Sequence, residues 1–348
     1  CCDGVSEQAA SRVRTHPATV MEASGPFSGD GRANVDMGSG YSAEGLTKRC
    51  HFTIAPSAYR RSATAYQPAE TSLNYRHAFH AGNFADLVKH AAVLAVLAQM
   101  TKDRAPVTVI DTHGGAGAYD LGGEMARKSG EAEAGIGRLM ALPKVPEVYQ
   151  PLIQAVKKLN DGKGLRLYPG SPLLVIEALR PGDHYRVCEL RPDDFALLEQ
   201  TLKGARAKVT ALMDDGYVMA AQQTPPSGPV LALIDPPFER ADDYDRAATA
   251  ALAMIKRNPG AVVMVWTPLK DLETFDGFLR RLEQVALPPT LIVEARLRPL
   301  TTPMRMNGCA LVILNASAEL TDPLKQAAGW VVEALGEPGG EARVWSLT

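Results

Sequence analysis

Four consecutive residues, Asp235, Pro236, Pro237 and Phe238, follow the apolar run 231–234 and are the candidate catalytic residues of this chain. An exocyclic amino group such as that of adenine is a poor nucleophile, because its lone pair is delocalised into the ring. A carboxylate and a backbone carbonyl that accept its two hydrogens would direct the lone pair toward an incoming methyl group. Prolines donate no backbone hydrogen bond and would hold the carbonyl rigidly, and an aromatic ring can stack on an unstacked base. The competing interpretation is a Pro-Pro turn with an aspartate as N-cap.

A glycine-rich segment, 111–117, follows another short apolar run and contains His113, Gly115 and Gly117. Glycines after a buried strand allow close backbone approach to a ligand, and the next helix favours negative charge at its N-terminus. Sites for dinucleotides and for S-adenosylmethionine both use this geometry. Taken alone, the segment is equally consistent with an ordinary structural turn.

Acidic residues follow two further apolar runs. Glu189 would accept hydrogen bonds from ribose hydroxyls, and Asp215 with Gly216 would meet the adenine amino group of a cofactor. A surface glutamate and a helix cap are the alternatives. Ligand-compatible groups at three successive strand ends predict a nucleoside cofactor. Methyl transfer from the sulfonium of S-adenosylmethionine needs in-line alignment and a polar site rather than a metal, so no metal site is expected.

The elements that must position these residues alternate between short apolar runs and helical patterns from residue 73 onward. Alternation of this kind predicts a mainly parallel sheet with helices on both faces. The predicted buried strands are Val107–Ile110, Tyr185–Cys188, Val209–Leu212, Val230–Ile234 and Ala261–Trp266. Thr290–Leu297 and Cys309–Leu314 predict a late antiparallel pair, Pro192–Leu202 and Tyr244–Lys256 are expected helices, and about 118–168 is expected to be an inserted helical subdomain.

Composition limits the class of protein. The chain has 348 residues, 46% of them hydrophobic and 22% charged, with a net charge of −2 and five cysteines without paired or zinc-ligand spacing. We expect a cytoplasmic protein without a membrane span or secretory signal. Residues 1–72 lack helical or strand periodicity and are expected to be a disordered or non-native extension. Seven acidic and seven basic residues there argue against a transit peptide.

At these motifs the chain resembles the RlmJ family, the 23S ribosomal RNA adenine-N6 methyltransferases. The resemblance runs from about Leu73 to the C-terminus, and its most specific block is the sixteen-residue signature Tyr75–His90. Further similar blocks are 111–117, 168–172, 189–192, 215–216 and 235–238. The motif ends in Phe238 where tyrosine is common, and Gly114 stands where alanine is common.

The resemblance implies a Rossmann-like class I methyltransferase fold, with a mainly parallel seven-stranded sheet, a late antiparallel hairpin and a small helical insertion. By resemblance, Asp235 would bind the target amino group, Tyr75 would meet the RNA, and Lys89 would hold a carboxylate or a phosphate of the substrate. The residues implied to contact S-adenosylmethionine are His90, His113, Ser171, Glu189, Asp215, Gly216 and Asp235. The implied partner is 23S ribosomal RNA before full subunit assembly, bound by a monomer.

Other functions stay open at this point. DNA adenine, cytosine N4 or a protein glutamine would be methylated by similar motifs, and a non-catalytic RNA-binding assembly factor would keep the fold without turnover. A nicotinamide-dependent oxidoreductase would share the glycine loop but gives the Asp-Pro-Pro-Phe motif no role. His77 and His80 are either structural or functional. Trp266 is expected in the core or pocket wall, and Arg305 lies in either a phosphate-binding loop or an ordinary hairpin connection.

Overall fold

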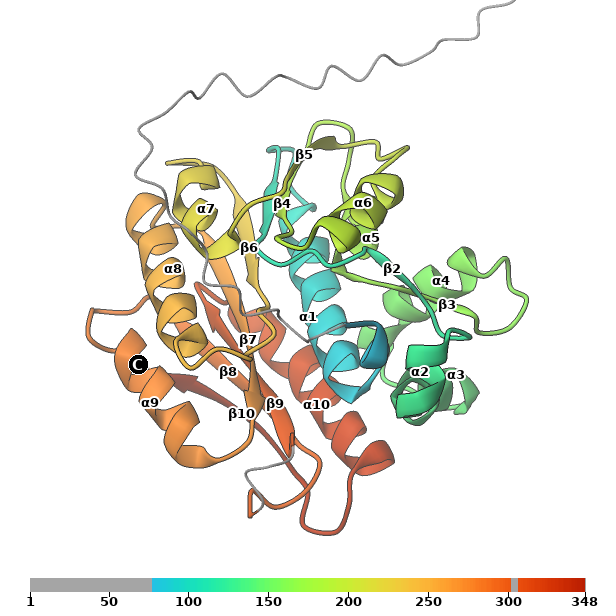
Figure 1. The fold of residues 1–348 in the computed structure, drawn as a ribbon. Helices are drawn as coiled ribbons and strands as arrows, with labels where there is room; N and C mark the ends of the chain where they lie inside the picture. Colours follow the sequence, from blue (N-terminus) through green and yellow to red (C-terminus); the bar gives the residue numbers. More distant parts are fainter. Residues whose placement is uncertain (1–76, 302–305, 348) are drawn as a thin grey trace, which may run out of the picture. The chain divides into compact units, whose positions relative to one another are not determined.

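The computed structural model describes residues 77–301 and 306–347, which form an α/β fold around one large sheet (Figure 1). Its eight strands lie in the order β10-β8-β9-β7-β6-β1-β4-β5. The parallel strands are β1 (Thr108–Asp111), β4 (His184–Cys188), β5 (Lys208–Leu212), β6 (Val230–Ile234) and β7 (Val262–Leu269). The antiparallel strands are β8 (Thr290–Arg296), β9 (Gly308–Leu314) and β10 (Glu341–Leu347). The predicted α/β class, with its parallel sheet and late antiparallel pair, is confirmed.

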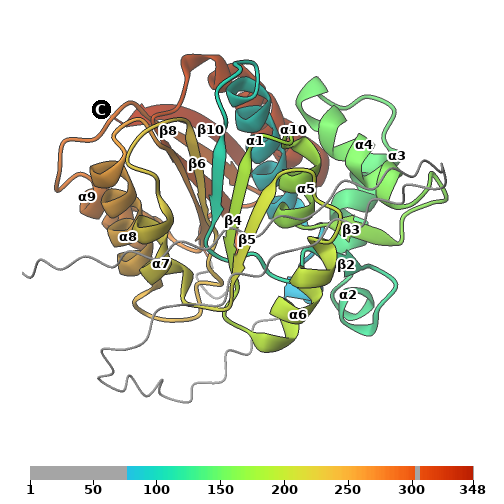
Figure 2. The same cartoon turned by 90° about the horizontal axis from the view of Figure 1, so that it is seen from above.

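Helices cover both faces of the sheet, so its central strands are apolar throughout, as in β6, where all five residues are buried (Figure 2). One face carries α7 (Gly216–Gln223), α8 (Asp243–Arg257) and α9 (Leu272–Leu282). The other carries α1 (Phe84–Met100), α5 (Ser171–Ala178), α6 (Pro192–Thr201) and α10 (Thr321–Leu335). Two separate apolar cores result, one on each side of the sheet.

The expectation of seven strands is wrong by one, because β10 adds an eighth at the edge. It pairs antiparallel with β8 over its whole length, from Glu341 opposite Arg296 to Leu347 opposite Thr290. Its residues are exposed or half-buried and include two charged side chains. An edge strand of this kind lacks the continuous apolar run that marks a buried strand, so the pattern gave no signal there.

The inserted subdomain contains a small second sheet as well as helices. Strands β2 (Ala118–Asp120) and β3 (Leu167–Pro169) pair antiparallel and bring the two ends of the insertion together. Between them lie short helical elements, namely α2 (Glu124–Ser129), a π-helical turn (Glu133–Gly137), α3 (Arg138–Ala141), a 3-10 turn (Glu147–Tyr149) and α4 (Gln150–Leu159). The strands were not predicted, because each is only three residues long.

Several expectations lie outside the described residues: the extension 1–72, Tyr75 and Arg305. Two short 3-10 turns, η1 (His77–Phe79) and η4 (Ala318–Leu320), complete the elements that the structure describes. In these same ranges, none of the helices combines the length and apolar character that a membrane crossing requires.

Candidate active site

The polar residues singled out above converge where the chain leaves adjacent strands toward opposite faces of the sheet. Strands β1 and β6 are neighbours and run parallel, and the backbone amide of Thr112 donates to the carbonyl of Leu233 at 3.0 Å. The helices on the way to the next strand of the large sheet, α5 between the insertion and β4 and α8 between β6 and β7, pack on opposite faces (Figure 2). Ligands of doubly wound sheets bind at such a switch point, outside the carboxyl ends of the strands.

Asp235, directly after β6, is held by a lysine from α1. Lys89 Nζ lies 2.6 Å from Asp235 Oδ2 and 2.7 Å from Asp86 Oδ1. Lys89 is only 4% exposed and Asp86 only 2%. Burial alone would lower the pKa of Lys89, but Asp235 and Asp86 raise it above its ordinary value, so the ammonium stays charged. Burial would likewise raise the pKa of Asp86, but Lys89 and His77 hold it well below the ordinary value.

This position corrects one expectation for Lys89. Of the two alternatives, the structure shows the carboxylate: the ammonium bridges two aspartates and is buried from solvent. A phosphate contact would need an accessible ammonium. Lys89 therefore contacts the candidate catalytic motif and is buried away from solvent.

Acceptor groups around Asp235 are left open. Only Oδ2 of its carboxylate is engaged by the described residues, and the side chain keeps 15% of its surface exposed. Neither the Pro236 nor the Pro237 carbonyl accepts a hydrogen bond from the described part of the chain. In the described part of the chain, one carboxylate oxygen of Asp235 and the two proline carbonyls that follow are thus without partners, as binding of an amino group requires.

Phe238 does not offer its ring to a base in this arrangement. The residue is 7% exposed, and its ring centroid lies 4.5 Å from that of Tyr244 and 5.9 Å from that of Trp266. Its φ of +50° is unusual for a residue with a side chain and indicates backbone strain. The neighbours come from α8 and β7, so their position could not be deduced from the motif.

The glycine loop is tied to its surroundings by specific bonds. Gly115 and Gly117 adopt positive φ, at +60° and +81°, which only glycine accepts readily. The amide of Gly115 donates to Glu189 Oε2 at 2.8 Å, and the amide of Arg191 donates to Oε1, also at 2.8 Å. Burial raises the pKa of Glu189. Glu189 thus holds the glycine loop in place. Each of its oxygens can accept a second hydrogen bond, so contact with a ribose stays a prediction.

Asp215 forms the helix cap that was the alternative to a ligand contact. Its Oδ1 accepts from the amide of Tyr217 at 3.0 Å, and Arg246 Nη2 lies 2.5 Å from Oδ2. A Cβ atom on Gly216 would lie 1.8 Å from the carbonyl oxygen of Thr112. The close approach that requires glycine here is therefore to backbone of the loop after β1.

Sequence reasoning missed the role of Asp111, the last residue of β1. It is fully buried, and its Oδ2 accepts from Ser171 Oγ at 2.8 Å and from the Tyr185 hydroxyl at 3.1 Å. Burial raises its pKa to about 6, against the lowering effect of these hydroxyls. A carboxylate at the first strand end followed by glycines was visible in the sequence, but its burial was not.

The signature histidines take three different positions. His77 Nε2 lies 3.1 Å from Asp86 Oδ2, and His80 Nδ1 lies 3.0 Å from Glu131 of the insertion. His90 Nδ1 lies 2.8 Å from the Tyr168 hydroxyl of β3, and its buried Nε2 has no hydrogen-bond partner among the residues that the structure describes. Burial lowers the pKa of His90 to about 3, so the ring is neutral. His77 thus contacts Asp86, the second partner of Lys89, whereas His80 connects the turn before α1 to the insertion.

His113 lies between the glycine loop and α7. Its ring meets that of Tyr217 edge to face at 4.7 Å, and its Nδ1 lies 2.7 Å from Thr112 Oγ1. Burial lowers its pKa to about 4, against the raising effect of the nearby Asp235 and Asp215 carboxylates. His113 is therefore a neutral side chain beside the catalytic motif.

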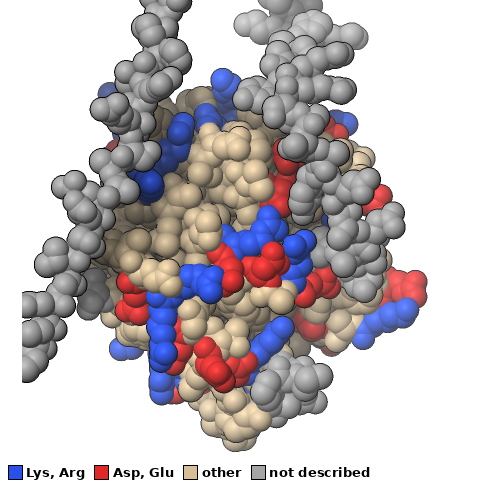
Figure 3. Space-filling view, turned by 60° about the vertical axis from the view of Figure 1, so that its left-hand side comes forward, with Lys and Arg blue, Asp and Glu red and all other residues tan. Residues whose placement is uncertain are grey.

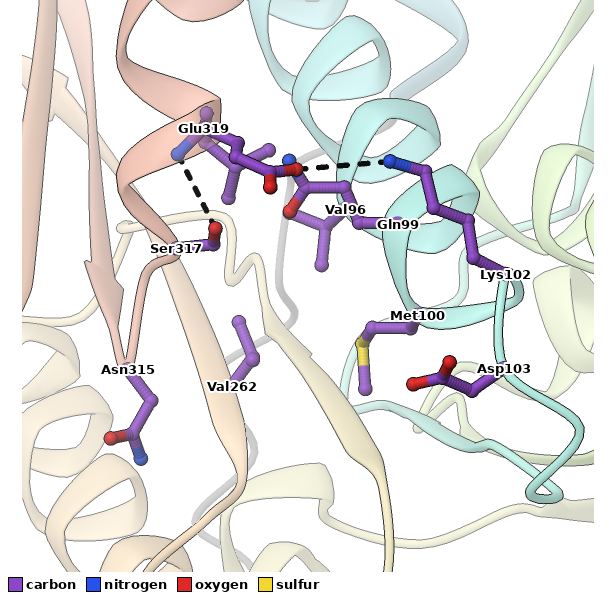
Figure 4. Close-up of a pocket in the computed structure, with 10 residues that line it drawn as sticks. Val96, Gln99, Met100, Lys102, Asp103, Val262, Asn315, Ser317 and Glu319 are labelled. Carbon is purple, nitrogen blue, oxygen red and sulfur yellow. Dashed lines mark hydrogen bonds and ion pairs between the residues drawn. The ribbon is translucent and has the colours of Figure 1, made fainter.

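A cavity elsewhere in the fold has no part in this site. It measures about 340 Å³ and lies where α1 ends and β7 begins, with Lys102 and Glu319 facing each other at 3.7 Å (Figure 4). Val262, the first residue of β7, lines it, so it opens at the amino edge of the sheet. In the described ranges, no three His, Cys, Asp or Glu side chains converge as metal ligands would.

Known proteins resemble this chain over most of its length. The family model described as "Ribosomal RNA large subunit methyltransferase D, RlmJ" matches residues 104–347. The ribosomal RNA large subunit methyltransferase J of Haemophilus influenzae is 32% identical over 269 residues, which cover 77% of this chain and 95% of the relative. The protein of the same name from Escherichia coli is 32% identical and matches over 98% of its own length.

A solved structure agrees with the fold as well. The crystal structure of a Legionella pneumophila protein superposes with a TM-score of 0.71 at 28% identity, covering 77% of this chain and 98% of the other. The family predicted from the N-terminal signature and the Asp-Pro-Pro-Phe motif is thereby confirmed. The chain belongs to the RlmJ family of ribosomal RNA large subunit methyltransferases.

Proposed function

We propose that this protein transfers the methyl group of S-adenosylmethionine to the exocyclic N6 of an adenine in large-subunit ribosomal RNA. The observation that carries the proposal is the state of Asp235. One carboxylate oxygen is held by Lys89 at 2.6 Å, while the other oxygen and the adjoining proline carbonyls have no partner among the described residues. Two open acceptors beside a glycine loop match the two hydrogens of an aromatic amine.

The residues around the strand ends fit the cofactor. When bound, S-adenosylmethionine supplies an electrophilic methyl carbon on a sulfonium. His90 offers a buried Nε2 that lacks a partner, and Glu189 lies at the end of β4 where a ribose would be expected. We assign cofactor binding to His90, His113, Gly115, Gly117, Ser171, Glu189, Asp215, Gly216 and Asp235.

Asp235 is the group that acts on the substrate. Its free oxygen and a proline carbonyl would accept the two N6 hydrogens, which localises the nitrogen lone pair for in-line attack on the methyl carbon. The new N–C bond forms as the S–C bond breaks, with the electron pair leaving on sulfur. The nitrogen then loses one proton, for which Asp235 is the nearest acceptor. Lys89 keeps the carboxylate in position during this step.

The target base must leave its stack to reach this site. Asp235 is recessed, with 15% of its side chain exposed, so a paired base cannot approach its free oxygen. Stacking of Phe238 on the base remains a prediction, and it requires the ring to leave the cluster with Tyr244 and Trp266. Because the base must be accessible, we propose 23S RNA before full subunit assembly as the substrate. The proposal further includes a monomeric, cytoplasmic enzyme and an RNA contact by Tyr75.

The surface charge of one face can be compared with what RNA binding requires. On the face shown in Figure 3, which lies over α7, α8 and α9, basic and acidic side chains are interspersed rather than separated. Non-specific binding of RNA depends on a basic surface that neutralises phosphates. This face therefore supplies no extended electrostatic field for RNA.

The proposal is tested by transfer of a tritiated methyl group to protein-free 23S RNA, DNA and ribosomal proteins. We expect label in RNA alone, as N6-methyladenine, and loss of about 100-fold or more in rate for Asp235→Ala. Asp276→Asn on exposed α9 is the matched control and should leave the rate unchanged. Label only in DNA or protein would contradict RNA as the proposed substrate. Unchanged ribosomal RNA methylation in cells carrying Asp235→Ala would favour a non-catalytic assembly factor.

A further inference from the structure

We propose that Asp86 is a positioning residue for methyl transfer: its carboxylate fixes the Lys89 ammonium, which in turn orients Asp235. This inference rests on the proposed function. Asp86 does not touch Asp235 itself, and its 2% exposure makes contact with RNA or cofactor impossible without rearrangement. Its effect on the reaction must therefore pass through Lys89.

Both oxygens of Asp86 are engaged, so the carboxylate is fixed in orientation. Oδ1 accepts from Lys89 Nζ at 2.7 Å. Oδ2 accepts from the backbone amide of Gly82 at 2.9 Å and lies 3.1 Å from His77 Nε2. The residue lies in the first turn of α1, which Asn83 caps by accepting from the amides of Ala85 and Asp86. Helix geometry and three donors thus place this carboxylate more rigidly than a flexible side chain alone would allow.

The lysine needs such an anchor because of its own flexibility. A lysine ammonium is a point charge on four rotatable methylenes, and it has no preferred planar geometry. Asp86 is three residues before Lys89, which places both side chains on one face of α1. With Nζ held by Asp86, the second donor meets Asp235 Oδ2 and leaves the other oxygen of Asp235 for the substrate. Without Asp86, the ammonium and the Asp235 carboxylate could rotate together.

The same carboxylate also connects the catalytic pair to the glycine loop. The His77 ring packs against the Tyr119 ring at 4.9 Å between centroids. The Tyr119 hydroxyl accepts from the amide of Ala116 at 3.2 Å. Through His77 and Tyr119, Asp86 therefore relates the position of Lys89 to the loop that is assigned to the cofactor. This path to the loop is an indirect ring contact, whereas the path to Lys89 is a direct ion pair. A positioning role through Lys89 therefore predicts a larger loss of rate than of cofactor affinity.

The experiment compares Asp86→Asn with Asp183→Asn in the full chain. Asp183 is a matched control, because it is 1% exposed, accepts from the amide of Val107 at 2.9 Å and pairs with Arg180, far along the sheet at its amino edge. We expect Asp86→Asn to lower kcat about 10- to 100-fold, with the KM for S-adenosylmethionine within about 3-fold. Asp183→Asn should lower Tm but leave kcat unchanged. Equal loss of kcat in both variants would reduce Asp86 to a structural residue.

A second measurement uses Lys89→Met as the background. If Asp86 acts through Lys89, Asp86→Asn should change single-turnover methyl transfer by less than about 2-fold once Lys89 is absent. The same fold loss in both backgrounds would overturn the inference. Cofactor binding by calorimetry and Tm show whether each variant is folded. Failure of the wild-type chain to methylate RNA would instead contradict the proposed function, and the two failures are therefore distinguishable.

Discussion

Two buried carboxylates, Asp86 in the first turn of α1 and Asp111 at the end of β1, have partners that differ in kind. Asp86 is paired with a lysine ammonium and receives two further donors, and its pKa is held well below the ordinary value. Asp111 receives only neutral donors, the hydroxyls of Ser171 and Tyr185 and a backbone amide, and burial raises its pKa to about 6. Similar burial thus gives opposite shifts, because the Lys89 cation lowers the pKa of Asp86, whereas the charge of Asp235 adds to the effect of burial on Asp111.

The difference indicates separate roles. A carboxylate fixed by a cation keeps its charge across the physiological range and can hold a catalytic pair in one geometry. A carboxyl buried without a cation is costly to ionise, although hydroxyls that donate to it reduce the cost. Asp111 joins strands β1 and β4 to the N-terminus of α5. The first cluster would serve transfer, whereas the second would serve the shape of the cofactor loop.

The largest effect is expected for Lys89→Met, which would remove the cation from the first cluster. Asp86 and Asp235 would then lack their shared cation in a buried site. We therefore expect the free energy of unfolding to fall by about 3–5 kcal/mol and kcat to fall about 100- to 1,000-fold. Without the cation, the pKa of Asp86 should rise, so the loss of stability should be smaller at pH 5 than at pH 8. Urea unfolding at both pH values measures this.

The control for that prediction is Lys158→Met. This lysine forms an exposed ion pair with Glu177, and both side chains are largely in water. We expect less than about 1 kcal/mol change in the free energy of unfolding and no change in kcat. If both variants lost similar unfolding free energy and kcat, the buried position of the Lys89 ion pair would not explain the effect of Lys89→Met.

A smaller effect, with an opposite dependence on pH, is expected for Asp111→Asn. Because the folded pKa of Asp111 is about 6, the wild-type carboxyl costs stability progressively as pH rises from about 4 to 6. Removing the charge should therefore make the variant gain about 2 kcal/mol relative to wild type between pH 4 and pH 7. Urea unfolding of both proteins across this range gives the difference. A difference independent of pH would contradict the raised pKa.

The parallel strands, and the place of Asp235 directly after β6, could be predicted from the sequence because local patterns carry them. Strand β6 is an unbroken apolar run, and the residue after it must lie at the sheet edge. The role of Asp86 was visible only in part: its spacing to Lys89 and His90 places all three on one helix face, but nothing local shows that this face is buried. The helical spacing predicts which residues of α1 are neighbours. Burial of their side chains depends on distant residues, such as Asp235 after β6 and Tyr168 of β3.

The remaining misses have a tertiary cause too. The orientation of Phe238 depends on Tyr244 and Trp266, which come from α8 and β7. Strand β10 is defined by its pairing with β8 rather than by its own half-exposed residues. In both cases a distant element, not the local residue type, determines the position.

The smallest effect is expected for Tyr185→Phe, which would remove one hydroxyl from the Asp111 cluster and keep the ring in the core. The hydroxyl donates to Asp111 Oδ2 at 3.1 Å, and a hydrogen bond to a charged acceptor contributes about 1.5–3 kcal/mol, against about 1 kcal/mol for a neutral one. The free energy of unfolding should therefore fall by about 1.5 kcal/mol or more at pH 7. Below pH 4, where Asp111 is protonated in the folded state, the loss should shrink toward about 1 kcal/mol. Equal losses at both pH values would show that Asp111 is neutral at pH 7 as well, and the contrast with Asp86 would then be one of charge state rather than of partners.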